Sequence, residues 1–238
     1  MSSRPTLSEL TWPMDDESCR QAENWAAGIK NQAFDWTWRA FDALRANVLG
    51  RVNLNQPLDQ LERDLARLHF SEIQTLWAKE TGGECAFAPH HEYPELETRS
   101  PAPAKPPAYD IAFVWNDNQR VALPIEAKVV PTPGTLAQYL KDTAKFTRGT
   151  AAPFTGEGAQ IAYLLTGTTD GFFTKLGNGL MSQLQPLPEF TARPHRMSSH
   201  TRKTAPDLRL HHMAMFCGRE QTQIAFPGFD QQAGLFER

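Results

Sequence analysis

The chain has 238 residues, of which 40% are hydrophobic and 21% are charged, and its formal net charge is −3. This composition is ordinary for a soluble globular protein, and the length suffices for one domain with a sizeable core, with or without a helical extension. The slightly negative charge argues against a large non-specific nucleic-acid surface, but it is compatible with a local basic cleft.

The three cysteines, Cys19, Cys85 and Cys217, lie far apart in the sequence. Their spacing fits neither a zinc site nor a disulfide framework, so a reducing cytoplasm is the expected location. Every apolar run is shorter than the roughly 20 residues that cross a membrane, and the N-terminus lacks the apolar core of a signal peptide. We therefore expect a cytoplasmic protein without membrane contact.

Residues 15–49 predict a helix, because apolar side chains recur at helical spacing after acids that suit a helix N-terminus. The helix carries a dense aromatic set: Trp25, Phe34, Trp36, Trp38 and Phe41. We interpret this set as a stripe that faces the core. The alternative is a helical arm that docks on a partner protein or on a second copy, since aromatic residues are enriched at interface cores. We assign residues 1–54 to an N-terminal helical extension.

A second helix is predicted to begin near residues 55–57 and to end at Gly82-Gly83. Most of its apolar face is supplied by six residues: Leu58, Leu61, Leu65, Leu68, Ile73 and Leu76. Residues 85–98 start apolar and become polar, which favours a first, partly exposed strand. A proline-rich connection follows at residues 100–107.

Residues 109–130 predict a β-hairpin, because two runs of aromatic and β-branched residues flank a polar break at residues 116–119. Asp110 opens the first run, and the second run carries Glu126 and Lys128. Side chains of a strand alternate with period two, so Glu126 and Lys128 point to one face and their apolar neighbours to the other. Charged side chains in mid-strand are costly unless they are solvated, paired or bound to a metal.

Two carboxylates on adjacent strands are suitable ligands for Mg²⁺, which prefers oxygen atoms and keeps several waters. Such an ion polarises a phosphoryl oxygen and lowers the pKa of a bound water, while a nearby lysine can stabilise the developing charge. Asp110, Glu126 and Lys128 supply these groups. The simpler alternative is a surface hairpin whose glutamate and lysine form an exposed ion pair of little energetic value.

The sequence Tyr109-Asp110, followed by Ile125-Glu126-Ala127-Lys128, resembles the motif of the PD-(D/E)xK nuclease superfamily, which has the restriction-endonuclease-like fold. It departs from the motif in having Tyr109 in place of the proline. The resemblance implies that Asp110 and Glu126 bind Mg²⁺, for which Mn²⁺ can substitute, and that Lys128 assists the attacking water.

In the same family, the helix before the first strand often contributes a further acid to the site. Glu72 is the candidate for this catalytic and metal-binding role by its position, and Glu62 and Glu80 are the alternatives. An equally simple interpretation is that Glu72 is a solvated surface residue.

The rest of the chain continues the order of elements. Residues 135–148 predict a helix, residues 160–167 a buried strand, residues 172–184 a helix and residues 212–216 a short strand. The order helix, three strands, helix, strand matches the αβββαβ core of the resembling fold. We therefore expect an α/β domain over residues 55–238, with a mixed central sheet flanked by helices.

One signature of the family is missing from the helix predicted at residues 135–148. Some branches place a Gln and a Tyr four residues apart there, whereas Gln138 of this chain is followed by Asp142.

Basic residues after the motif are candidates for contacts with nucleic-acid phosphates. Lys141 and Lys145 lie on the helix predicted at residues 135–148, and the most basic segment of the chain, residues 192–212, is expected to be a loop. The candidates in this segment are Arg193, Arg196, Arg202 and Lys203. The alternative is that all of these are solvated surface charges.

These expectations point to a Mg²⁺-dependent nuclease that hydrolyses phosphodiester bonds in DNA with water as the nucleophile. Defence of bacteria against foreign DNA is the commonest setting that the resemblance implies. Cutting both strands of a duplex favours a homodimer, and the N-terminal helices are candidates for contacts with that copy or with another protein.

One alternative is a non-catalytic subunit that keeps the fold and binds nucleic acid or protein. Another is an enzyme that acts on a small phosphate ester.

Overall fold

The computed structural model describes residues 16–94, 108–153, 155–203 and 205–218, with the backbone alone described for residues 16–23 and for Arg120. The helices are α2 (Asp16–Asn47), α3 (Leu58–Thr81), α4 (Ala137–Thr147) and α5 (Thr169–Leu180), with short 3-10 helices η1 (Leu49–Arg51) and η2 (Pro188–Phe190). The strands are β1 (Phe87–Pro94), β2 (Ala108–Trp115), β3 (Asn118–Val130), β4 (Glu157–Leu164), β5 (Gln185–Pro186), β6 (His195–His200) and β7 (Leu208–Phe216). The proline-rich connection predicted at residues 100–107 lies outside the described residues.

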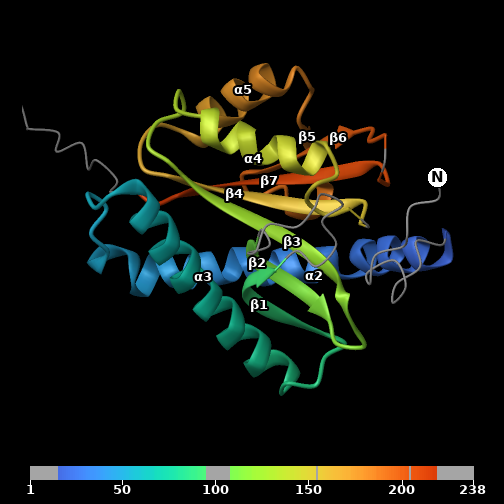
Figure 1. Cartoon of the computed structure of the whole chain (residues 1–238). Coiled ribbons are helices and arrows are strands. Elements are labelled where there is room, and N and C mark those ends of the chain that lie inside the picture. Colours follow the sequence, from blue (N-terminus) through green and yellow to red (C-terminus); the bar gives the residue numbers. More distant parts are fainter. Residues whose placement is uncertain (1–15, 95–107, 154, 204, 219–238) are drawn as a thin grey trace, which may run out of the picture.

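The strands form one mixed sheet in the order β1-β2-β3-β4-β7-β6-β5 (Figure 1). Strands β1, β2 and β3 are antiparallel neighbours. The pairs β3–β4 and β4–β7 are parallel, and β6 runs antiparallel to both β7 and β5. The predicted α/β architecture, with a mixed sheet and flanking helices, is therefore confirmed.

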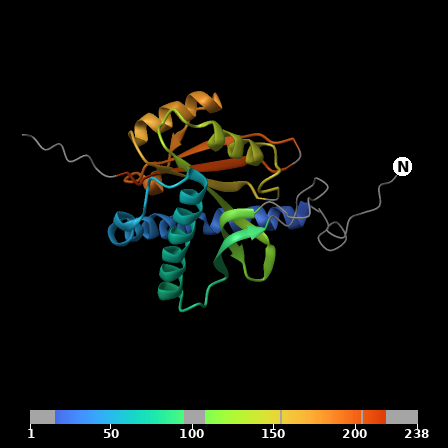
Figure 2. The same ribbon diagram turned by 60° about the vertical axis from the view of Figure 1, so that its left-hand side comes forward.

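The two faces of the sheet have separate helical covers. Side chains alternate along β4, so Ile161 joins the core beneath α2 and α3, whereas Ala162 and Leu164 join the core beneath α4 and α5. Figures 1 and 2 show these two pairs of helices on opposite sides of the strands. No helix among the described residues is both long and apolar enough to cross a bilayer.

Helix α2 is part of the main core. Phe34, Trp36, Trp38 and Phe41 are buried in it, and the partly buried Trp25 packs against it. The interpretation of the aromatic set as a core-facing stripe is confirmed, and these rings are not a free docking surface. The helical extension predicted for residues 1–54 therefore shares one core with the sheet over its described part.

Helix α3 begins and ends close to the predicted positions. Pro57 occupies the N-cap, and the helix stops at Gly82, whose φ of 63° lies in the left-handed region that favours glycine.

The segment at residues 192–212 differs from the prediction of a loop. It contains β6 and the start of β7, which pair with each other. The buried positions of β6 are His195 and Ser198, both polar. Apolar alternation is the usual sequence signal for a strand, and it is missing where polar side chains fill the buried positions.

A chain of hydrogen bonds crosses the core between α2 and the sheet. Trp38 Nε1 can only donate, so it donates to His195 Nδ1 (3.3 Å). A neutral His195 then carries its proton on Nε2 and donates to His211 Nδ1 (3.2 Å), and His211 Nε2 donates to Glu157 (3.0 Å). Lys30 on α2 also donates to Glu157 (2.9 Å). These contacts satisfy polar groups that burial would otherwise destabilise.

A second buried histidine joins α3 to α2 and β4. His69 Nε2 lies 2.7 Å from the backbone carbonyl of Thr37, which can only accept, so this nitrogen carries the proton. His69 Nδ1 then accepts from the hydroxyl of Tyr163 (2.9 Å). Burial lowers the pKa of His69 from 6.5 to about 4, although the contact with Thr37 opposes the shift.

We expect the fold to lose stability in acid, partly through His69. Between about pH 6.5 and about pH 4, the unfolded chain binds a proton at this position and the folded chain does not, so stability falls as the pH falls through this range. The full shift is worth about 3 kcal/mol. The contribution of His69 is the difference in pH dependence between wild type and His69→Gln, which keeps a donor and an acceptor. Urea unfolding of both proteins across this pH range measures it. Equal loss of stability by both proteins in this range would contradict the assignment.

Candidate active site

The site lies where β2 and β3 separate. The two strands pair as far as Ile111 opposite Ile125, and β3 continues to Val130 with β4 on its other side. Beyond this point the backbone N–H groups on the outer side of β3 need new acceptors. The carboxylate of Asp110 accepts from the N–H of Ala127 (2.7 Å), and the carboxylate of Glu62 on α3 accepts from the N–H of Val129 (3.2 Å).

Asp110 and Glu126 place two carboxyl groups side by side at this fork. Burial raises the pKa of Glu126 to about 8, with the charge of Asp110 as the next cause. Burial also raises the pKa of Asp110, while the N–H of Ala127, the charge of Lys128 and a hydrogen bond with Glu126 oppose the rise. Two neighbouring carboxylates in a poorly solvated site cannot both be charged at low cost, so the pair holds a proton near neutral pH. A divalent cation would relieve the same repulsion.

Lys128 is the cation beside this pair, and its side chain is only 14% exposed. Its Nζ donates to Glu62 Oε1 at 2.5 Å and lies 3.5 Å from Asp142 Oδ2. Burial lowers the pKa of Lys128, but the hydrogen bond and charge of Glu62, with the charges of Asp110 and Asp142, raise it above the ordinary value. The ammonium group therefore stays protonated and can stabilise negative charge.

The acid that α3 contributes is Glu62, not Glu72, so the structure corrects this prediction. The two glutamates are ten positions apart, which is about 15 Å along the helix axis and on a different face. Glu80, the third possibility, accepts from Trp36 (2.7 Å) and pairs with Arg39. The apolar pattern of α3 predicts which face of the helix is buried. It does not predict which turn of the helix lies against β3 at the fork.

Helix α4 supplies a further acid that sequence reasoning missed. Asp142 is 1% exposed, and its Oδ1 lies 2.6 Å from Nζ of Lys145. It shares the buried face of α4 with Tyr139, Thr143 and Phe146, at helical spacing. An acid on the apolar face of a predicted helix was the signal that could have found it, because a buried carboxylate needs a partner.

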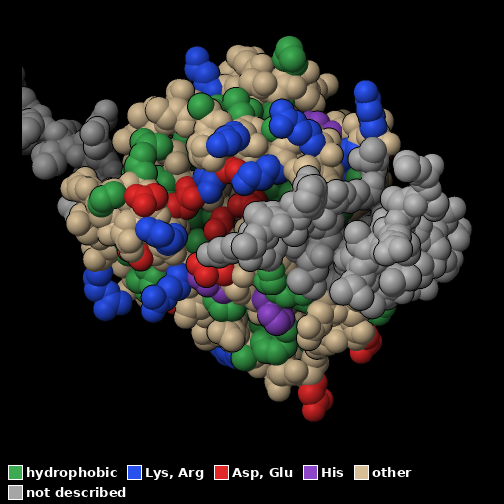
Figure 3. Space-filling model, viewed as in Figure 1, with side chains coloured by type: hydrophobic (Ala, Val, Ile, Leu, Met, Phe, Trp, Pro, Cys, Tyr) green, Lys and Arg blue, Asp and Glu red, His purple; other side chains and the backbone are tan. Residues whose placement is uncertain are grey.

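Charged side chains gather around the fork on the surface of the molecule. Figure 3 shows acidic side chains at the centre of this face, between α4 and α3, with Lys and Arg side chains over both helices. Charged groups of both signs from α3, β2, β3 and α4 thus converge at one place.

The donor set is suited to Mg²⁺ rather than to a metal held entirely by protein. Within the described residues, no three His, Cys, Asp or Glu side chains come together as a metal site. Mg²⁺ is commonly bound by one or two carboxylates, with waters and substrate phosphates completing its coordination. Asp110 and Glu126 could supply these two carboxylates, and their pKa values are raised, mainly by burial, in spite of the nearby charge of Lys128.

The basic candidates differ in exposure. The three lysines, Lys141, Lys145 and Lys203, are exposed, and Lys145 contacts Asp142 at the candidate site. Arg193 and Arg196 are half-buried, and both contact aromatic rings.

Arg193 pairs with Asp42 of α2 (2.9 Å) and lies over the ring of Trp38. This places it on the α2 side of the sheet, away from the α4 side on which Lys145 lies. Arg196 lies over Phe173 at 5.4 Å and donates to the backbone of His195. The position of Arg193 on the α2 side therefore does not fit a phosphate contact beside the carboxylates.

Arg202 is a structural residue, so the prediction of a phosphate contact is wrong for it. Its side chain enters the interior, and its guanidinium donates to the backbone carbonyls of Phe146 (3.3 Å), Ala152 (2.9 Å) and Thr155 (2.8 Å). An arginine has several donors in a fixed arrangement, so one guanidinium can join three backbone segments.

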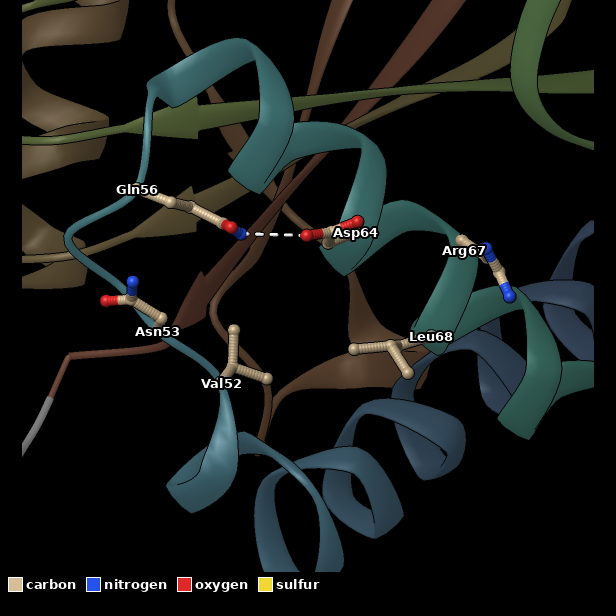
Figure 4. A pocket seen from close by; sticks show the side chains of 6 residues that line it. All are labelled: Val52, Asn53, Gln56, Asp64, Arg67 and Leu68. Atoms are coloured by element: carbon tan, nitrogen blue, oxygen red, sulfur yellow. Dashed lines mark hydrogen bonds between the residues drawn. The ribbon is translucent and has the colours of Figure 1, made fainter.

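A cavity of about 290 Å³ lies apart from the carboxylates (Figure 4). It is lined by Val52, Asn53, Gln56, Asp64, Arg67 and Leu68, and Gln56 donates to Asp64 across it (2.9 Å). Asp64 is two residues after Glu62, which is about 200° around the helix. The cavity therefore lies on the other side of α3 from the candidate site.

Comparisons with known proteins add no assignment. No protein-family model matches the chain, and no curated protein and no solved structure matches it. The candidate site is therefore supported by its own geometry.

We expect Arg202→Ala to destabilise the protein by about 2–4 kcal/mol, because the backbone carbonyls of Ala152 and Thr155 lose the guanidinium as their donor. The adjacent, exposed Lys203→Ala is the matched control, and its effect should stay within about 0.5 kcal/mol. Urea unfolding measures both. A small effect of Arg202→Ala would contradict the structural role.

Proposed function

We propose that the protein is a Mg²⁺-dependent nuclease of the PD-(D/E)xK type that hydrolyses phosphodiester bonds in DNA. The observation that carries the proposal is the convergence of Asp110, Glu126 and Lys128 at the fork between β2 and β3. The order α3, β1, β2, β3, α4, β4, with β4 parallel to β3, supports a restriction-endonuclease-like core.

The roles follow from the chemistry of each group. Asp110 and Glu126 would hold Mg²⁺, which, when bound, supplies stabilisation of charge on phosphoryl oxygens and lowers the pKa of water. Lys128 stays charged, so it orients the attacking water and stabilises negative charge instead of removing a proton. Glu62 fixes the position of the Lys128 ammonium, and it is a positioning residue in this scheme.

We expect wild type to cleave supercoiled plasmid DNA in Mg²⁺ or Mn²⁺ and not in EDTA. Glu126→Gln and Lys128→Met should each lower the rate by about 10²–10³-fold, because the first removes a carboxylate that would hold Mg²⁺ and the second removes the charge that stabilises the transition state. Glu189→Gln, which changes an exposed carboxylate on η2, is the control. Circular DNA also reports internal attack.

The possible results of this assay have different meanings. Cleavage that survives Glu126→Gln and Lys128→Met would show that the site is wrongly assigned. A wild-type protein that binds DNA and does not cleave it in either metal would favour the non-catalytic alternative. Preference for a small phosphate ester over DNA would favour the third function.

A pair of variants on α3 tests the correction of the helix acid. Glu62→Gln should lower kcat at least about tenfold, because it removes the charge that holds Lys128 and leaves a poorer acceptor for the N–H of Val129. Glu72→Gln should change kcat less than about twofold, since the same substitution then acts about 15 Å away along the helix. Equal effects of the two variants on kcat would show that the assignment of Glu62 is wrong.

A further inference from the structure

Helix α4 is fixed on the sheet by buried polar contacts. Thr143 Oγ1 donates to Gln160 Oε1 (2.6 Å), and Gln160 Nε2 donates to the backbone carbonyl of Tyr139 (3.3 Å). The hydroxyl of Tyr139 contacts His212 Nδ1 (3.0 Å). Gln160 is the β4 neighbour of Glu126 in the sheet register. These contacts hold the inner face of α4, and with it Asp142, at a defined height over the candidate site.

Asp142 contacts two lysines at different depths. Its Oδ2 lies 3.5 Å from Lys128 Nζ, and its Oδ1 lies 2.6 Å from Lys145 Nζ. The carboxylate is buried, the Lys128 side chain is 14% exposed and the Lys145 side chain is 45% exposed. One buried acid therefore holds one ammonium at the bottom of the site and another at its mouth.

The charge of Lys145 also acts on Glu126. It opposes the raised pKa of Glu126 more strongly than Lys128 does, after the larger effects of burial and Asp110. Lys145, which is bound to Asp142 and 45% exposed, is thus near Glu126 and near solvent at once. Lys141, one turn earlier on α4, is exposed, and no described contact links it to the carboxylates.

We propose that Lys145 binds a backbone phosphate of the nucleic acid at the mouth of the site, and that Asp142 is the positioning residue for Lys145 and Lys128. The proposal rests on the proposed function, because it places the substrate beside Asp110 and Glu126. It adds a second cation and its anchor to the motif residues.

The two lysines differ in how easily they can change partners. Lys128 has two carboxylates, Glu62 and Asp142, and little contact with solvent. Lys145 has one carboxylate partner, Asp142, and its side chain is 45% exposed, so its ammonium can turn toward solvent while the buried Asp142 keeps its contact with Lys128. Lys145 can therefore leave Asp142 for a phosphate while Lys128 remains in place.

Duplex DNA labelled with fluorescein and titrated in Ca²⁺ tests the phosphate contact by fluorescence anisotropy. Lys145→Ala should raise Kd about 5–10-fold and lower the slope of log K against log salt by about one, as loss of one phosphate contact does. Lys145→Arg should restore most of the affinity. Lys79→Ala, which removes an exposed lysine at the far end of α3, is the control. Equal effects of Lys145→Ala and Lys79→Ala would overturn the proposal.

Asp142→Asn separates a positioning role from a purely structural one. It removes the competitor of the phosphate for Lys145, so DNA binding should become about 2–5-fold tighter. It also removes one of the two anchors of Lys128, so kcat should fall about 10–100-fold. A structural defect would weaken binding and activity together, and weaker binding by Asp142→Asn would overturn the positioning role.

The two proposals fail in different ways. Wild type that binds the duplex in Ca²⁺ and does not cleave it in Mg²⁺ would overturn the nuclease function, and the binding arms would still test Lys145 and Asp142. Wild type that cleaves, with Lys145→Ala unchanged in Kd and salt slope, would overturn only the further inference. Absence of binding by wild type would overturn the phosphate contact itself.

Discussion

The separation of β2 from β3 is the constraint on which the candidate site depends. An edge of a strand presents N–H groups that must find acceptors, and on the outer side of β3 these acceptors are the side chains of Asp110 and Glu62. The strand that carries Glu126 and Lys128 is therefore bordered by carboxylates for a structural reason. In the proposed nuclease, the two acids that accept from the backbone of β3 are also the ones that act at the site, so one set of contacts fixes both roles.

Burying so many charges is costly, and the fold offsets the cost by pairing. Buried ions are tolerated when their partners and remaining hydrogen bonds are present. Lys128 has acids from α3 and α4, and Asp142 has lysines from β3 and α4. The pair of Asp110 and Glu126 differs, because it is two acids with incomplete compensation. A divalent cation would complete the compensation, which is why the proposed function assigns Mg²⁺ to this pair.

The sheet also keeps its two faces chemically distinct. On the α2 side, the buried chain from Trp38 to Glu157 is filled and its donors and acceptors are matched. On the α4 side, Gln160 and His212 fix a helix that reaches the surface beside the carboxylates. One polar network thus holds the N-terminal helix on the core, while the other positions groups at the candidate site.

The sequence by itself determined the α/β architecture, the core-facing aromatic stripe of α2 and the hairpin with Asp110, Glu126 and Lys128, because these depend on local periodicity. Only the tertiary structure decided that Glu62 and not Glu72 reaches Lys128, that Asp142 joins two lysines and that Arg202 is internal. It also revealed β6, whose buried positions are polar. These facts depend on how helices cross the sheet and on which polar groups meet in the interior, and periodicity along one element carries neither.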